Sequence, residues 1–295
     1  MPIGDLCAIG SAVVWSFSMI LMRVSGLSIP ALPLTFFKIV VAIICFAIVL
    51  TFQGQLLVTG LTTGDFLRLS ASAVLGITLA DTMIASALNR LGASLQALAD
   101  CAYSPAIALT GLIMFGDKLN SWELIGGSLV VAGVFVGAAM TTEVKSKRDL
   151  WIGVILAAAA HVIMAIGILM VRDIYTQHSV VWVSGFRFLI AAVVMFIGVA
   201  VITPHQIGQK LFLGFRRRDT WRTMIPMAIL GPFLATLLWV AGFKYLPAGR
   251  AAIFNQLSTV FIIILAYLFL REKITPRKAL GTALALLGSL LVITH

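Results

Sequence analysis

Long apolar runs recur along the whole chain, and they constrain its fold more than any other feature of the sequence. A helix needs about 20 predominantly apolar residues to cross the hydrocarbon core of a bilayer. Runs of this kind lie near residues 4–22, 33–52, 66–88, 93–116, 122–141, 151–171, 181–202, 222–243, 248–270 and 277–294. The sequence therefore predicts an all-α integral membrane protein with ten transmembrane helices.

The composition agrees with a protein that is dissolved in lipid. Of the 295 residues, 61% are hydrophobic and 11% are charged, whereas soluble globular domains carry about 25% charged residues. A net charge of +10 could suit nucleic acid, but the basic residues lie in short gaps between the apolar runs. A nucleic-acid site would need them on one face or tail, so we predict no nucleic-acid partner. The N-terminal run is long and has no basic leader, which favours a retained first helix over a signal peptide.

The second half of the sequence repeats the first. Each half contains an acidic residue that is followed by glycines nine and sixteen positions later. These residues are Asp117, Gly126 and Gly133 in the first half and Glu272, Gly281 and Gly288 in the second. Lys38 matches Arg187 at an offset of 149, and the later matches have an offset of 155. We therefore predict two five-helix repeats, at 1–141 and 150–295. Because five is odd, the second repeat enters the membrane with opposite polarity, as in the inverted repeats of secondary transporters.

This pattern is similar to that of the EamA family of the drug/metabolite transporter superfamily. Further marks of the resemblance are Ala12-Val-Val-Trp15 in the first span, and Phe37-Lys38 and Phe186-Arg187-Phe188 in the second span of each half. The family's Gly-Glu motif is Gly116-Asp117 in the first half and Arg271-Glu272 in the second, so each copy departs by one residue.

The resemblance covers nearly the whole chain and implies a secondary carrier that works by alternating access without a bound cofactor. We expect its small-molecule substrates to be amino acids or related compounds, moved outward. A multidrug or nucleotide-sugar-type carrier and a lipid scramblase or flippase are the alternatives.

Polar residues at matched depth in the two halves predict a substrate-binding cavity between them. Asp100 and Asn255 occupy equivalent positions in the fourth and ninth spans. The residues expected near them are Gln96, Tyr103, Gln256 and Ser258, with Trp15 and Trp239 as apolar walls. An unpaired buried polar group costs on the order of several kcal/mol, and a water-filled cavity bordered by spans one, three, four, six, eight and nine would satisfy all of them. Hydrogen bonding between helices is the competing interpretation.

Four further ionisable side chains lie deep in the predicted spans, where such groups are costly and are functional candidates. Lys38 and Arg187 are predicted to attract an anionic group such as a carboxylate, unless they snorkel toward the interface. Asp81 and His161 are candidates for carrying a proton, although a lone histidine without a visible partner is also typical of packing.

An enzyme has little support in the sequence. No HExxH, GxSxG or Walker A sequence occurs, and there is no histidine–cysteine cluster. Cys7, Cys45 and Cys101 lie within apolar runs at no disulfide or metal-site spacing, so we expect no metal and no cofactor. One enzyme hypothesis stays open, because Asp81 and Asp100 lie on adjacent predicted helices and paired carboxylates can act as acid and base.

The basic residues bear on the orientation of the chain. Fourteen of the 21 lysines and arginines lie in or beside the gaps after odd-numbered spans, and five lie on the other side. The positive-inside rule then places both termini outside, whereas the family resemblance implies both termini in the cytoplasm, and the two alternatives stay open. We further expect a multi-pass protein of the prokaryotic cytoplasmic membrane. It should function as a single chain, because the duplicated halves supply both sides of the cavity.

Overall fold

The computed structural model describes residues 3–55, 60–116, 121–138, 144, 146–245 and 248–294. It describes the backbone but not the side chains at 115, 138, 240, 242–244, 248–256 and 293. Asp117 of the first acidic motif therefore lies outside the described residues, and so do the side chains of Asn255 and Gln256.

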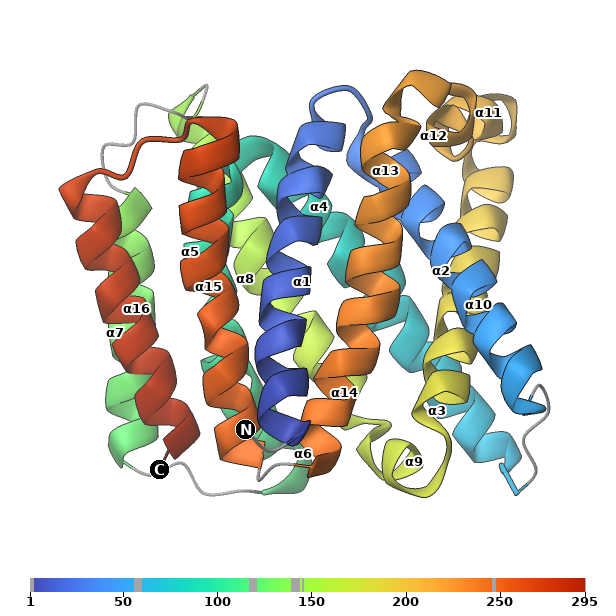
Figure 1. The fold of residues 1–295 in the computed structure, drawn as a ribbon, viewed down its shortest axis with the longest axis horizontal. Helices are drawn as coiled ribbons and strands as arrows, with labels where there is room; N and C mark the ends of the chain where they lie inside the picture. The colour runs from blue at the N-terminus through green and yellow to red at the C-terminus, as the bar shows by residue number, and fades with distance from the viewer. Residues whose placement is uncertain are drawn as a thin grey trace.

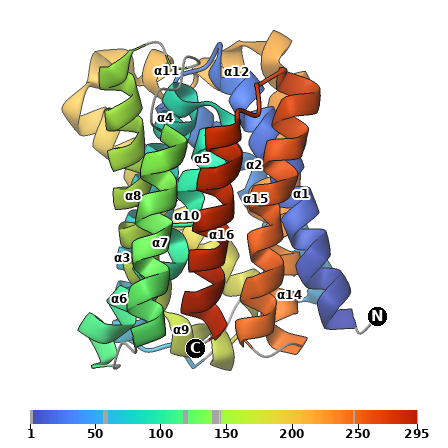
Figure 2. The same cartoon turned by 90° about the vertical axis from the view of Figure 1, so that its left-hand side faces the viewer.

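Every regular element within these ranges is a helix, and the long helices stand side by side in one bundle (Figures 1 and 2). The first half contains α1 (Ile3–Gly26), α2 (Ala31–Gln53), α3 (Thr63–Ala73), η1 (Val74–Leu79), α4 (Ala80–Leu91), α5 (Ala93–Asp100), α6 (Tyr103–Phe115) and α7 (Ser121–Ala138). The second half contains α8 (Lys147–Leu169), α9 (Arg172–Gln177), α10 (Val180–Ile202), η2 (Pro204–Gln206), α11 (Ile207–Lys210), α12 (Leu213–Arg216), η3 (Arg218–Thr220), α13 (Trp221–Ala228), η4 (Ile229–Ala235), α14 (Thr236–Tyr245), α15 (Ala248–Leu270) and α16 (Pro276–Thr294). Helix α1 begins and α16 ends at the same end of the bundle (Figure 1).

The apolar runs of the sequence form these helices, as predicted. Seven helical stretches in the described part are long and apolar enough to cross a membrane: 3–26, 31–53, 63–91, 93–114, 147–169, 180–202 and 218–239. Shorter apolar helices occupy Ser121–Gly137 and Leu257–Leu270, and α16 covers the last predicted run. Large apolar side chains such as Phe52, Ile113 and Val201 are exposed on the outside of the bundle. Lipid is the solvent that suits such a surface, so the fold is that of an all-α multi-pass membrane protein.

Two of the apolar stretches contain a π-helical segment at equivalent positions. η1 separates α3 from α4, and η4 separates α13 from α14. The two segments begin at Val74 and Ile229, and 229 − 74 = 155 is the offset of the later sequence matches. π-Helical turns inside α-helices are frequent at functional sites.

Serine hydroxyls on α1 bond to carbonyl groups of the second π-helical stretch. In a π-helix the N–H of residue 232 would bond to the carbonyl of residue 227, but Pro232 has no N–H. Ser18 Oγ donates to the Met227 carbonyl at 2.8 Å instead, and Ser11 Oγ donates to the Ala235 carbonyl at 3.0 Å. These bonds fix α1 against η4 and the end of α13.

Glycines of the repeated acidic motif form the contact between α7 and α16. A Cβ atom at Gly126 would lie 2.5 Å from the Gly288 carbonyl oxygen, and one at Gly133 would lie 2.6 Å from the Gly281 carbonyl oxygen. The pairing of these residues requires α7 and α16 to run antiparallel, side by side (Figure 2). Small residues allow this close approach, which is a common device between membrane helices.

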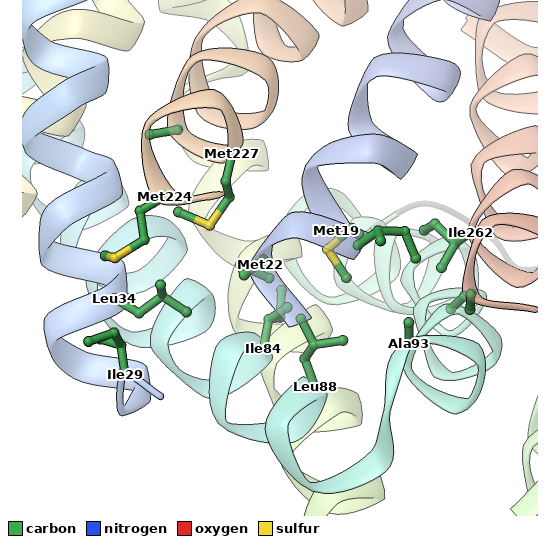
Figure 3. Packing of buried hydrophobic residues seen from close by; sticks show 14 of the residues in the cluster. Met19, Met22, Ile29, Leu34, Ile84, Leu88, Ala93, Met224, Met227 and Ile262 are labelled. Atoms are coloured by element: carbon green, nitrogen blue, oxygen red, sulfur yellow. The ribbon is translucent and has the colours of Figure 1, made fainter. Parts of the chain in front are cut away.

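A large apolar cluster joins the two halves toward the end of the bundle where α1 ends (Figure 3). Its side chains come from α1, α2, α4 and α5 of the first half and from α8, α13 and α15 of the second. The larger members are Met19, Ile20, Met22, Ile29, Leu34, Phe37, Ile84, Leu88, Met224, Met227 and Ile262. Packing of these side chains joins the halves at this end.

Candidate functional site

Asp100, the last residue of α5, lies at the centre of a polar cluster inside the bundle. Its Oδ1 atom accepts a hydrogen bond from Gln96 Nε2 at 2.8 Å and lies 2.9 Å from His161 Nε2. Gln96 and Asp100 are four residues apart on α5 and so share a helical face, whereas His161 comes from α8. The ring of Tyr103, at the start of α6, packs on the imidazole with centroids 5.9 Å apart. We call these four residues the Asp100 cluster.

Two polar atoms of the Asp100 cluster, Gln96 Oε1 and His161 Nδ1, are buried without a hydrogen-bond partner among the described residues. An unsatisfied buried group costs about 1–3 kcal/mol, so such atoms are few in native proteins. The Asp100 side chain remains 21% exposed. The cluster therefore has both the unused hydrogen-bonding capacity and the access that a polar ligand or water requires.

The structure gives His161 the partner that the sequence does not reveal. Its partner Asp100 is 61 positions away in the chain and belongs to the other half. His161 is therefore not a lone side chain, and its role in carrying a proton stays a prediction.

Lys38 and Asp81 form a second buried pair, between α2 and α4. The Lys38 Nζ atom lies 2.8 Å from Asp81 Oδ2, and the two side chains are 5% and 16% exposed. Lys38 therefore points into the bundle and does not snorkel to the interface. Asp81 pairs with Lys38 and Asp100 with His161, so each carboxylate has its own basic partner.

Arg187 also points into the bundle, so snorkelling is wrong for this residue too. It lies in the second turn of α10 and is buried. One terminal nitrogen donates to the Tyr175 hydroxyl at 2.8 Å, and the other donates to the Ser72 carbonyl at 3.4 Å. Neither Tyr175 nor Ser72 was a predicted site residue, and a single tyrosine or serine carries no signal in the sequence.

The other predicted site residues are less closely connected to the Asp100 cluster. Trp15 packs against the apolar cluster of Figure 3. The Ser258 carbonyl on α15 accepts a hydrogen bond from Ser16 Oγ at 3.2 Å, and Trp239 is half-buried on α14. Asn255 and Gln256 lie on α15, with side chains outside the described part of the structure. Their place in a substrate site stays a prediction.

A small cavity of about 160 Å³ lies away from these residues, between α5, α15 and α16. Its lining is mainly apolar and contains none of the predicted site residues: Ser94, Leu98, Val260, Ile263, Ile264, Ile274, Lys278, Ala279 and Thr282. The predicted central cavity between the halves therefore also stays a prediction.

Glu272 caps a helix of the opposite half. The sequence alone indicates only a local charge pair or a local helix cap for this residue. Its carboxylate accepts hydrogen bonds from the backbone N–H groups of Ala93 and Ser94 at 2.8 and 2.9 Å, where α5 begins. A carboxylate stabilises the N-terminus of a helix through its free N–H groups and dipole. Gly92 precedes this cap with φ +82°, a conformation that favours glycine. Glu272 thus fixes the start of the helix that carries Gln96 and Asp100.

Comparison with known proteins identifies relatives along almost the full chain. The EamA-like transporter family matches residues 2–138 and 151–294. The uncharacterized transporter YetK of Bacillus subtilis (strain 168) is 30% identical over 145 residues, which are 48% of this chain and 41% of that protein. The uncharacterized transporter sll1164 of Synechocystis sp. is 24% identical over 235 residues, which are 78% of this chain and 66% of that protein. The matches therefore span less than two thirds of either relative. A solved crystal structure that is 16% identical has the same fold, with a TM-score of 0.67 over 98% of this chain and 95% of that chain.

Proposed function

Because this chain belongs to the EamA-like transporter family, we propose that it is a secondary carrier that moves a small metabolite across a bilayer by alternating access. The observation that carries the proposal is the Asp100 cluster, which places unsatisfied polar atoms and a carboxylate inside the bundle. Ionisable groups within a membrane are costly and are functional candidates by default. The proposed substrates are amino acids or related compounds, moved outward.

The proposed architecture is ten transmembrane helices in two inverted repeats, 1–141 and 150–295. It is supported by the two family matches, by the two π-helical segments 155 residues apart, and by the antiparallel contact of α7 with α16. Carriers built in this way bind their substrates at the interface of the two halves. Asp100 and His161 come from different halves, so their pair lies at such an interface.

The proposed proton-exchanging group is the Asp100–His161 pair. Protonation of His161 would place a donor on Nδ1, which is buried without a partner, and would strengthen the attraction to Asp100. A substrate ammonium group competing for Asp100 would favour loss of that proton. Asp81 suits this role less well, because Lys38 already neutralises its charge.

The proposed setting is the cytoplasmic membrane of a prokaryote, with one chain as the functional unit. The relatives described above are bacterial, which supports the setting. One chain contributes both members of the Asp100–His161 pair, which supports a working monomer. Activity found only in obligate cross-linked dimers would contradict the second point.

Flux into vesicles tests the function. The full chain is purified, reconstituted in lipid and screened with amino acids and cationic drugs, without ATP. We expect saturable flux of at least one amino acid, reduced about tenfold or more in Asp100→Asn, because a hydrogen bond to a charged group contributes about 1.5–3 kcal/mol. Asp219→Asn is the matched control, since the Asp219 side chain is 60% exposed and pairs only with nearby Arg217 in the described structure.

Three outcomes of this experiment would replace the proposal. Rapid lipid flip-flop without solute flux would indicate a scramblase. Flux of drugs but of no amino acid would indicate a multidrug carrier, and a chemically altered product would indicate an enzyme.

A further inference from the structure

Arg187 is a buried cation without a carboxylate partner. Other basic side chains do have such a partner. Those that lie within 4.0 Å of an aspartate are Lys38, Arg68, Arg90 and Arg217. Arg187 makes no such pair within the described part of the chain, although the residue is only 7% exposed. A guanidinium group does not lose its proton in proteins. The guanidinium of Arg187 therefore places a permanent positive charge in the interior of the bundle.

The hydrogen-bond donors of Arg187 are only partly used. One terminal nitrogen donates to the Tyr175 hydroxyl and the other, over a long 3.4 Å, to the Ser72 carbonyl. Nε is buried and has no partner. Both acceptors are neutral, and the guanidinium lies 5.8 Å from the centroid of the Tyr175 ring. The planar fork of arginine donors matches a carboxylate in a two-point interaction.

Lys38 provides an internal comparison, because it occupies the equivalent position in the first half at an offset of 149. Both side chains are buried, but Lys38 is neutralised by Asp81 at 2.8 Å. Burial of a charge without a partner is strongly unfavourable. An unneutralised arginine at one of two equivalent positions is therefore what a site for an exchangeable anion would require.

Two neighbouring segments, η1 and α9, lie beside the Arg187 side chain. Gly76 of η1 leaves room for the guanidinium, since a Cβ atom there would lie 3.0 Å from its terminal nitrogen. On the other side, α9 carries Tyr175 and is held by Arg68, which bonds to Asp173 and lowers the pKa of that carboxyl.

From this geometry we infer that Arg187 is the subsite that binds the carboxylate group of the transported solute. The inference rests on the proposed carrier function and specifies its substrate class as small carboxylates, amino acids included. Lys38 does not bind the carboxylate of the solute, because its ammonium group already pairs with Asp81. The neutral acceptors Tyr175 and Ser72 hold the guanidinium in place while leaving its charge available.

Ligand-induced stabilisation tests the subsite independently of transport. The full chain in nanodiscs is heated alone and with amino acids, monocarboxylates, the neutral amide of each acid, and inorganic phosphate. We expect at least one acid to raise Tm while its amide does not. Arg187→Gln should weaken the apparent affinity for that acid by about 10- to 100-fold, the loss of a charged hydrogen bond. Arg187→Lys should retain part of it, because the charge remains but the fork is lost.

Stability without ligand provides a second measurement. Arg187→Met removes an uncompensated charge and should leave Tm unchanged or higher, whereas Lys38→Met strands Asp81 and should lower Tm. Stabilisation by no acid, stabilisation by phosphate alone, or equal stabilisation of Arg187→Gln and the wild type would each overturn the subsite. Acid binding that depends on Arg187 without any vesicle flux would contradict the carrier but not the subsite. Flux of a neutral solute that is unaffected by Arg187→Gln would contradict the subsite but not the carrier.

Discussion

The ionisable residues buried inside this bundle have different kinds of partner. Lys38 pairs with Asp81, and His161 pairs with Asp100, each across two helices. Arg187 is bonded only to neutral groups in the described structure. Because a buried charge is tolerated beside an opposite charge and unfavourable alone, we propose three different roles for them: a structural pair, a proton-exchanging pair and an anion subsite.

The Lys38–Asp81 pair leads to a prediction for stability. Lys38→Met or Asp81→Leu alone should lower the free energy of unfolding by about 3–5 kcal/mol, because each leaves a buried charge unpaired. The double variant Lys38→Met/Asp81→Leu should recover most of this loss. Unfolding in mixed micelles measures all three. Additive losses in the double variant would show that the two side chains do not interact.

At the scale of elements, backbone contacts made possible by small residues hold the helices together. α7 and α16 meet through glycines, and α1 is fixed to η4 by serine hydroxyls. Lipid tails are as apolar as leucine, so helix association in a membrane depends on close packing and interhelical hydrogen bonds.

The glycine contact can be tested by adding one methyl group. Gly133→Ala would place a Cβ atom 2.6 Å from the Gly281 carbonyl oxygen, and such overpacking costs about 1–3 kcal/mol. Gly198→Ala in α10 is the matched control, because nothing lies within 4 Å of the added atom. It should be neutral or stabilising by up to about 1 kcal/mol, since alanine is the better helix former. Equal effects on the unfolding free energy would rule out the steric explanation.

The bond from Ser18 to the Met227 carbonyl yields a second prediction at this scale. Ser18→Ala removes the hydrogen bond between α1 and the Met227 carbonyl of α13, at a cost of about 0.5–1.5 kcal/mol. Ser128→Ala is the control, because the exposed Ser128 hydroxyl bonds only to the Leu124 carbonyl of its own helix in the described structure. Thermal unfolding of both variants in the same lipid measures the difference, which should vanish if Met227 finds another donor.

At the scale of the whole molecule, the bundle has one strongly basic end. Helices α11 and α12 lie at the end where α1 ends (Figure 1). The described basic residues in or beside the gaps at this end are Arg23, Arg90, Lys147, Arg148, Lys210, Arg216, Arg217, Arg218, Arg222, Arg271, Lys273, Arg277 and Lys278. Basic residues are retained on the cytoplasmic side of membranes, so we expect this end to face the cytoplasm, with the start of α1 outside.

Cysteine labelling checks this orientation. Gln209 is exposed at the basic end, and Gln55 is exposed after α2 at the opposite end. In a variant without the three natural cysteines, Gln209→Cys should react with a membrane-impermeant maleimide only after the cells are opened. Gln55→Cys should react in intact cells. The reverse pattern would place both termini in the cytoplasm, as the family resemblance implies.

The sequence by itself determined the helices and their membrane setting. Apolar runs specify membrane helices because a chain in lipid must satisfy its backbone within each segment, whatever its neighbours are. The glycines at 126, 133, 281 and 288 were identifiable as packing residues because their spacing repeats in both halves.

Only the tertiary structure decided which polar groups meet. Helical periodicity places Gln96 and Asp100 on one face, because they are four residues apart. It carries no information about His161, 61 positions from Asp100, or about Glu272, 179 positions from the N–H of Ala93 that it binds. Such partners depend on how far each helix is rotated and where it crosses its neighbours, and these are set by side-chain packing over the whole bundle. For the same reason, the sequence placed Lys38 and Arg187 at equivalent positions, but only the fold paired Lys38 with Asp81 and gave Arg187 no carboxylate among the described residues.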